Sequence, residues 1–207
     1  MIQVQAAIYP WHQTIWLQLQ AAFIQQQLPH ALLFSGETGC GHEQLVYSLA
    51  QSLLCLQPNA KGVACKHCRS CTVFAAQAHP DFMLLAVAED KQAITVDQVR
   101  SLDRFLELSH SYSPNRVVVI LEAEAMNNNA ANSLLKSLEE PTNNSYILLF
   151  TKQVAKLLPT IRSRCQQLRM PLPSQILALE WLKQHSLPDQ AVNLLSLAKG
   201  RPLAALG

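Results

Sequence analysis

The sequence predicts an α/β protein in which a three-layer domain on a parallel sheet, residues 1–170, precedes a small helical domain, residues 171–207. Short apolar segments alternate with amphipathic helical patterns along the first domain, as in α/β folds. The apolar run at residues 117–121 is uninterrupted and rich in β-branched side chains, which is typical of a strand buried on both faces of a parallel sheet. Only helical patterns follow the proline-containing linker at residues 171–173.

The elements follow in order along the chain. Apolar residues at helical spacing predict a first helix over residues 11–27, which ends near Pro29 because proline cannot continue a helix. Strands are expected where short apolar segments lie between turn residues, at 30–35, 82–87, 117–121, 146–150 and 166–170. The 3.6-residue period predicts further helices at 42–56, 96–108 (with Thr95 as N-cap), 129–138, 156–160, 174–184 and 188–198.

Composition restricts the classes of function. Apolar residues make up 49% of the 207 residues, and the net charge of +2 is too small to argue for nucleic-acid or membrane binding. The chain has no run of eighteen apolar residues, and residues 1–5 lack the features of a signal peptide, so a cytoplasmic location is expected. Six cysteines in such a chain are expected to be metal ligands or buried thiols rather than disulfides.

The segment between the first strand and the next helix has the glycine spacing of a phosphate-binding loop, but it lacks the residues that contact phosphate and Mg²⁺. The frame runs from Gly36 through Gly39 to Gly41, where an active P-loop continues with Lys and then Ser or Thr. This chain has His42 and Glu43 instead. A neutral imidazole cannot replace an ammonium group, and a carboxylate repels phosphates. We therefore expect a nucleotide-binding scaffold without bound nucleotide, with an active ATPase that has an unusual P-loop as the alternative.

Four cysteines follow this helix in a short excursion at residues 55–71: Cys55, Cys65, Cys68 and Cys71. Three of them at three-residue spacing can converge on one tetrahedral ion, and the helix end supplies the fourth. Thiolates favour Zn²⁺, and four protein ligands leave no open position, so a structural zinc site is expected. The alternatives are free thiols, or His67 in place of one thiolate. Cys40 and Cys165 lie far away in the sequence and are treated as separate.

The buried strand at 117–121 ends in a pattern that does not suit a Mg²⁺ site. Leu121 stands where a Walker-B strand carries Asp, and Glu122 follows it. A one-residue slip would make Glu122 the metal carboxylate, but the downstream spacing favours a plain buried strand. Farther on, Arg162 and Arg164 end a short helix. They are either a solvated surface pair or guanidinium groups directed at a neighbouring subunit's nucleotide.

The run NSLLKSLEEPT at 132–142, followed by TIRSRC at 160–165, resembles the AAA+ subunits of bacterial replicative clamp loaders. The cysteine insert, the Tyr-Pro-Trp run at 9–11, the His-Pro-Asp run at 79–81 and the absent P-loop lysine agree with this family. The resemblance spans the whole chain. It implies an AAA+ P-loop-type α/β domain with a zinc-binding insert, followed by a helical lid domain.

The resemblance also implies a role. The chain would be a non-catalytic stator in the clamp loader of the DNA polymerase III holoenzyme, which places a sliding clamp on primed DNA during replication. Its expected partners are the motor subunits (gamma/tau), the delta subunit and, through the complex, the clamp and primed DNA, with no membrane. Arg164 would be an arginine finger acting in trans, with Ser163 and Cys165 holding its backbone, and zinc would be held by Cys55, Cys65, Cys68 and Cys71.

Further departures from the motor pattern agree with this role. Thr151 stands at the expected sensor-1 position, and Leu203 replaces the sensor-2 arginine, with Arg201 nearby. The family's third, collar domain is not recognised, so the chain is expected to be the first two domains of a longer protein. A weaker alternative is direct DNA binding through the cysteine insert, whose cations at residues 61, 66 and 69 would support only salt-sensitive contacts.

Overall fold

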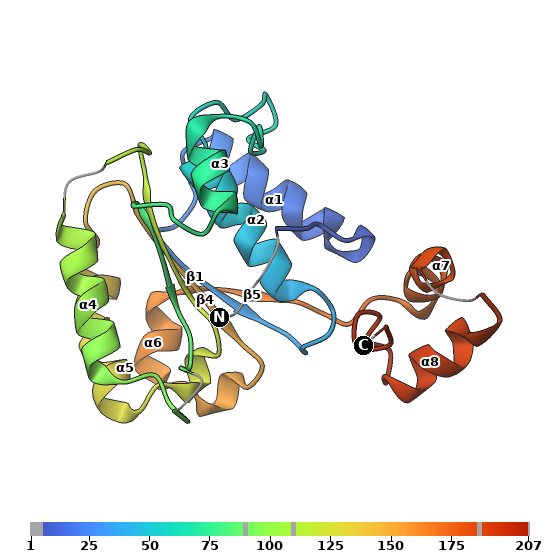
Figure 1. Ribbon diagram of the computed structural model, residues 1–207. Coiled ribbons are helices and arrows are strands. Elements are labelled where there is room, and N and C mark those ends of the chain that lie inside the picture. The colour runs from blue at the N-terminus through green and yellow to red at the C-terminus, as the bar shows by residue number, and fades with distance from the viewer. Residues whose placement is uncertain (1–5, 89–90, 109–110, 186–187, 207) are drawn as a thin grey trace.

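Five parallel strands form one sheet in the order β2-β3-β4-β1-β5, so the predicted parallel sheet is confirmed (Figure 1). The computed structural model describes residues 6–88, 91–108, 111–185 and 188–206. Residues 1–5, on which the expectation of no signal peptide rests, lie outside this description. The strands are β1 (Ala31–Ser35), β2 (Phe82–Leu85), β3 (Arg116–Ile120), β4 (Ser145–Thr151) and β5 (Gln166–Arg169).

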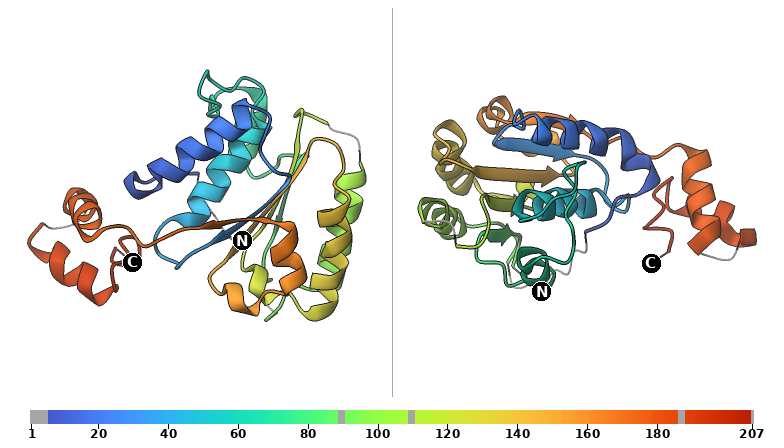
Figure 2. Two further views of the ribbon diagram at one scale, coloured as in Figure 1. Left: turned by 180° about the vertical axis from the view of Figure 1, so that it is seen from behind. Right: turned by 90° about the horizontal axis from the view of Figure 1, so that it is seen from above.

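Helices cover both faces of the sheet, which gives the expected three layers (Figures 1 and 2). One face carries α1 (Gln13–Ile24), α2 (His42–Leu54) and α3 (Arg69–Ala75). The other carries α4 (Val96–Glu107), α5 (Asn128–Glu139) and α6 (Pro159–Arg164). Short 3-10 turns are η1 (Pro10–His12), η2 (Ala123–Ala125), η3 (Val154–Lys156) and η4 (Pro188–Gln190). None of the helices in the described part of the chain is both long and apolar enough to cross a membrane.

Alternation along the strands divides the core into two parts. Leu33 and Ile147 belong to the cluster under α4, α5 and α6, whereas their neighbours Leu32 and Leu148 belong to the cluster under α1 and α2. Successive side chains of a strand point to opposite faces, so a sheet covered on both sides needs apolar residues at every position. This requirement explains why the strands were recognisable as continuous apolar runs.

Parallel strands bring all their carboxyl ends to one edge of the sheet, and this decides where the candidate sites lie. The P-loop follows β1 at the carboxyl edge, while Cys55 follows the returning helix α2 at the amino edge. Arg164 lies two residues before β5, whose first residue Gln166 pairs with Leu32 near the start of β1, so it also belongs to the amino edge. The five residues of β1 separate the two edges by roughly 17 Å.

Helix α3 was missed by the sequence reading, which expected an irregular segment up to residue 71. Cys68 is its N-cap, and the Cys68 sulfur accepts the backbone N–H of Cys71. The three-residue spacing of Cys68 and Cys71, which suggested metal ligands, is thus also the spacing between a helix N-cap and the backbone N–H that it accepts. The irregular expectation was wrong for residues 69–71 because a seven-residue helix shows too little periodicity to be recognised.

Two helices follow the sheet, α7 (Gln175–His185) and α8 (Ala191–Leu197). They pack around a small apolar cluster of their own, formed by Ala178, Leu182, Ala191 and Leu195. Figure 1 shows them beside the carboxyl end of the sheet, joined to it by the segment that follows β5. The division into domains at residue 170 stays a prediction.

Candidate functional site

The P-loop is packed beneath other parts of the same chain. Gly39 and Gly41 have φ angles of +81° and +76°, a region that glycine occupies without steric cost. A methyl group at Gly41 would lie 2.2 Å from the Tyr9 ring, and one at Gly39 would lie 2.7 Å from Ala204 Cβ. Glycine is therefore needed at both positions for the conformation and also for the close approach of the covering residues.

His42 begins α2, at the sequence position where an active P-loop has its lysine. Its side chain is buried, its Nδ1 lies 3.0 Å from His12 Nε2, and a methyl group at Gly36 would lie 2.6 Å from its ring. Burial lowers the pKa of His42 to about 4. Burial, and then the charge of His42, lowers the pKa of His12 to about 3. Both rings are therefore neutral at physiological pH, and they supply no cation for a phosphate.

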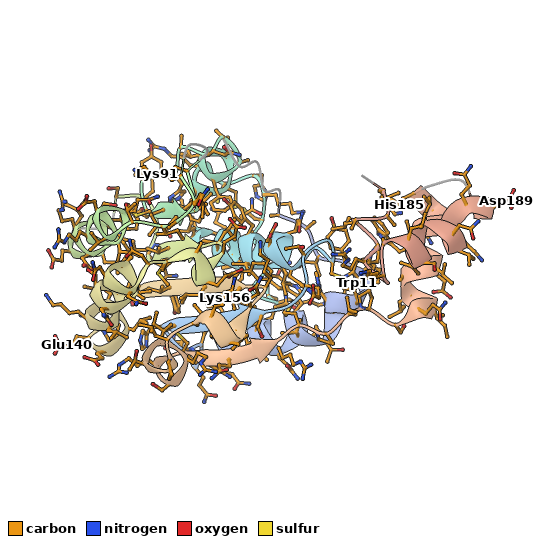
Figure 3. All side chains as sticks on the ribbon, turned by 90° about the horizontal axis from the view of Figure 1, so that it is seen from below. Trp11, Lys91, Glu140, Lys156, His185 and Asp189 are labelled. Atoms are coloured by element: carbon orange, nitrogen blue, oxygen red, sulfur yellow. The ribbon has the colours of Figure 1, made fainter. Side chains whose placement is uncertain are left out.

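An aromatic cluster closes the loop from the side of the C-terminal helices. Tyr9 stacks on Trp11 with ring centroids 5.2 Å apart, and Trp181 of α7 meets each of these rings edge-on at 5.6 Å. The Trp11 indole N–H donates to the carbonyl of Cys40 at 2.7 Å. Figure 3 shows Trp11 where the sheet domain meets the C-terminal helices. These contacts join the N-terminal segment, the P-loop and α7.

The cavity that remains at the loop has a volume of about 180 Å³. Its lining includes His42, Glu43, Phe150 and Leu203. Pockets that hold ligands of drug size or larger usually measure ~300–1,000 Å³. Leu203, the residue at the expected sensor-2 position, donates its backbone N–H to the carbonyl of Gly39 at 2.9 Å. An apolar side chain thus lies over the loop where an arginine would have to reach a phosphate.

Carboxylates lie close to the expected Walker-B position at the end of β3. Leu121 is buried, and Glu122 pairs with Lys152 at 3.1 Å. Burial, and then repulsion by Glu122, raises the pKa of Glu43, while Lys152 opposes the shift. Thr151, at the expected sensor-1 position, donates its hydroxyl to Glu124 at 2.6 Å. Thr151 and Lys152 thus each engage one carboxylate at this edge, while Glu124 Oε1 is buried without a hydrogen-bond partner among the described residues.

The four cysteines of the insert converge as predicted, and their geometry could hold a metal ion. All four sulfur atoms lie within 4.8 Å of one another. The Cys55 sulfur lies 3.6 Å from that of Cys65 and 3.9 Å from that of Cys68. A tetrahedral ion with metal–sulfur bonds of about 2.3 Å requires sulfur atoms about 3.8 Å apart. His67 is exposed, and its ring lies 2.8 Å from the carbonyl of Cys65 rather than joining the sulfur cluster.

Backbone N–H groups support the thiolate form that a metal requires. The N–H of Cys65 lies 3.3 Å from the Cys55 sulfur, and the N–H of Cys68 lies 3.3 Å from the Cys65 sulfur. Burial raises the pKa of the Cys68 thiol, but hydrogen bonds from the backbone of Cys71 and Leu56 and from neighbouring thiols outweigh it and bring the pKa to about 6. Burial raises the pKa of the Cys55 and Cys71 thiols in the same cluster, as it does for the two separate thiols, Cys40 and Cys165.

A buried polar network, which the sequence did not reveal, lies next to the cysteine insert and contacts the end of α2 and the start of α3. Asp81 accepts backbone N–H groups from residues 111–113 at 2.7–2.9 Å and pairs with Arg116 at 3.2 Å. His79 Nε2 lies 2.8 Å from the hydroxyl of Ser70 in α3, which donates to the carbonyl of Leu54. The only signal in the sequence was the His-Pro-Asp run, which served as a family mark and had no assigned role.

Arg164 lies at the end of α6, on the opposite edge of the sheet from the chain's own P-loop. Its Nε donates to Glu139 Oε1 at 2.6 Å, its Nη2 pairs with the same oxygen, and its Nη1 donates to the carbonyl of Thr160 at 2.9 Å. About a third of its side chain is exposed. The hydroxyl of Ser163 also donates to Thr160, and Cys165 is buried in the core.

Comparisons with known proteins agree with this architecture. A family model described as "DNA polymerase III, delta subunit" matches residues 11–174. The chain is 45% identical over 204 residues to DNA polymerase III subunit delta' of Pseudomonas aeruginosa, an alignment that covers 97% of this chain and 61% of that protein. It is 36% identical over 200 residues to the Escherichia coli protein of the same name, with 96% and 60% covered. The chain thus spans about three fifths of the length of these relatives.

Solved structures share the fold at lower identity. A DNA polymerase III gamma subunit-related protein of Thermotoga maritima aligns with a TM-score of 0.64 and 22% identity, over 92% of this chain and 56% of that one. Thermotoga maritima RuvB aligns with a TM-score of 0.58 and 14% identity, over 94% and 58%. These two likenesses concern the fold alone.

Proposed function

The chain belongs to the DNA polymerase III delta-prime family, and on this premise we propose that it is a non-catalytic stator of the clamp loader. In this role it binds no nucleotide of its own and helps a complex of related subunits to load the sliding clamp on primed DNA. Its direct partners are the gamma/tau motor subunits and the delta subunit. Its contacts with the clamp and with DNA are made through the complex.

One observation carries the proposal, namely the closed P-loop. His42 occupies the lysine position as a buried neutral ring, and the remaining cavity of about 180 Å³ is lined in part by Glu43 and Leu203. Binding ATP here would require a cation for the β- and γ-phosphates and a ligand for Mg²⁺. Neither requirement is met by the side chains of this loop, which supports the absence of hydrolysis by this chain.

Arg164 supports a role in a neighbour's ATP site. The guanidinium lies at the amino edge of the sheet, one strand length from its own P-loop, so a phosphate that it contacts must belong to another subunit. Its exposed fraction leaves the group accessible, and its planar fork suits a phosphate. We assign Arg164 as an arginine finger acting in trans.

The metal site is assigned a structural role, with Zn²⁺ as the ion. Cys55, Cys65, Cys68 and Cys71 supply four sulfur ligands within 4.8 Å of one another, and such a set leaves no position open for a substrate. When bound, the ion would cross-link the end of α2 to the start of α3. The chain's own contribution is the set of backbone N–H groups that stabilise the thiolates.

The test is ATP hydrolysis by the reconstituted clamp loader carrying Arg164→Ala in the full-length subunit. We expect hydrolysis at the affected site to fall by ~10³-fold or more, and total hydrolysis and clamp loading to fall less because other sites keep their arginine. Arg169→Ala, an exposed arginine of β5, is the matched control and should leave both rates unchanged. An unchanged rate with Arg164→Ala would exclude the finger assignment.

A further inference from the structure

Glu139, the last residue of α5, makes two of the three hydrogen-bonding contacts described above for the Arg164 guanidinium. We propose that Glu139 is a positioning residue, whose carboxylate orients Arg164 for contact with a phosphate of the neighbouring subunit's nucleotide. This inference rests on the proposed function of Arg164. It assigns a role to a carboxylate that the sequence analysis treated only as part of the family run at residues 132–142.

The contacts fix the guanidinium and still leave donors for a ligand. Glu139 Oε1 engages the Nε hydrogen and one Nη2 hydrogen, and the carbonyl of Thr160 engages one Nη1 hydrogen. One N–H therefore remains on each terminal nitrogen. Two such donors are what a guanidinium needs for a bidentate contact with phosphate. The arrangement can thus hold Arg164 and present it at the same time.

The position of Glu139 at the end of α5 makes its contact with Arg164 important for the local balance of charge. The C-terminus of a helix bears a partial negative charge, so a carboxylate in the last turn of α5 is destabilising by itself. Arg164, by contrast, lies at the C-terminus of α6, where a cation is favourable. The guanidinium of Arg164 compensates the charge of Glu139, and this ion pair explains why an acid is tolerated at the end of α5.

Both ends of the contact stand on fixed backbone. Leu138, directly before Glu139, and Cys165, directly after Arg164, are buried in the same apolar cluster under the sheet. Ile161 of α6 is fully buried there as well. Because the backbone on both sides is fixed, the remaining motion is rotation about the bonds of the Arg164 side chain. The Glu139 carboxylate restricts this rotation.

The surface around the pair is open to a partner. About half of the Glu139 side chain and a third of the Arg164 side chain are exposed. Figure 3 shows Glu140, the next residue, at the opposite end of the molecule from the C-terminal helices. The pair is thus presented on a surface far from the chain's own closed P-loop.

The experiment is a double-mutant cycle in the reconstituted clamp loader with full-length subunits, measuring kcat and KM for ATP and the thermal unfolding of the purified variant subunit. Glu139→Ala should lower kcat about tenfold with little change in KM, because orientation of the finger matters in the transition state. Glu139→Gln keeps the accepting oxygen and should retain most of the rate. Glu140→Gln, the adjacent exposed acid, is the matched control and should have no effect.

The cycle separates the failure of this inference from failure of the proposed function. In the Arg164→Ala background, adding Glu139→Ala should cause no further loss. A further loss of rate in the Arg164→Ala background would mean that Glu139 is merely structural. A higher rate with Glu139→Ala alone would mean that the carboxylate only restrains the finger. Either result, or an unchanged rate, overturns the positioning role. If Arg164→Ala itself has no effect, the arginine-finger assignment fails as well.

Discussion

Acidification should destabilise this chain through His12 and His42, which are buried together beneath the covering residues of the P-loop. Burial lowers the pKa of His42 to about 4, and burial together with the neighbouring ring lowers that of His12 to about 3. In the unfolded chain both rings take up protons below pH ~6.5. Their contribution to stability is therefore complete above that pH, and it is lost as the pH falls toward 4.

The magnitude follows from the distance between the ordinary pKa and the working pH. A pH of 5 lies about 1.5 units below the pKa of each ring in the unfolded chain, and each unit corresponds to about 1.4 kcal/mol of unfolding free energy. At pH 5, keeping each ring neutral in the folded chain therefore lowers the free energy of unfolding by about 2 kcal/mol, and the pair lowers it by about 4 kcal/mol. A typical domain is stable by only ~5–15 kcal/mol, so the loss should be easy to measure.

The assay is urea unfolding at pH 7.5 and at pH 5, in wild type and in His42→Gln. Glutamine can still hydrogen-bond His12 but does not titrate, so the variant should lose about 2 kcal/mol less than the wild type between the two pH values. Gln184→Ala, a change at an exposed residue of α7 that does not titrate, is the control and should lose as much as the wild type. Equal losses in wild type and His42→Gln would refute the buried neutral pair.

Three further results are expected. Chelation should increase hydrogen exchange of the insert, residues 55–71, while the sheet stays protected, because the cysteines lie outside it; global unfolding would contradict this. Asp81→Asn should lower the urea unfolding free energy by about 3 kcal/mol, because it weakens a buried ion pair; a loss below about 1 kcal/mol would argue against that pair. Gly41→Ala should cost more unfolding free energy than Gly200→Ala, since both have φ near +77° but only Gly41 meets a ring; equal costs would exclude the contact.

The sheet could be predicted because its strands are buried on both faces. Residues such as Val118 and Val119 face different helical layers, so no polar residue interrupts the run. The cysteine cluster was recognisable because a tetrahedral site constrains spacing along the chain as well as distances in space. In both cases a local sequence pattern is tied directly to a three-dimensional requirement.

Contacts between distant segments could not be predicted in this way. His12 and His42 are 30 residues apart, and no motif joins them, so the reason that His42 can be buried became visible only in the structure. The same holds for Glu139 and Arg164, which are 25 residues apart. The sequence showed that His42 departs from the P-loop pattern, and the family resemblance led to the expectation that Arg164 is a finger. The partners that hold each side chain depend on the packing of separate elements.

Nucleotide titration of the metal-loaded chain tests the central claim most directly. The measurement is calorimetry with ATP and with ADP in the presence of Mg²⁺, with an active P-loop ATPase as the positive control. The closed loop and the neutral His42 predict no detectable binding at millimolar nucleotide. Binding in the micromolar range would contradict the account, because it would mean that the loop opens and that His42 and Glu43 are compatible with phosphates.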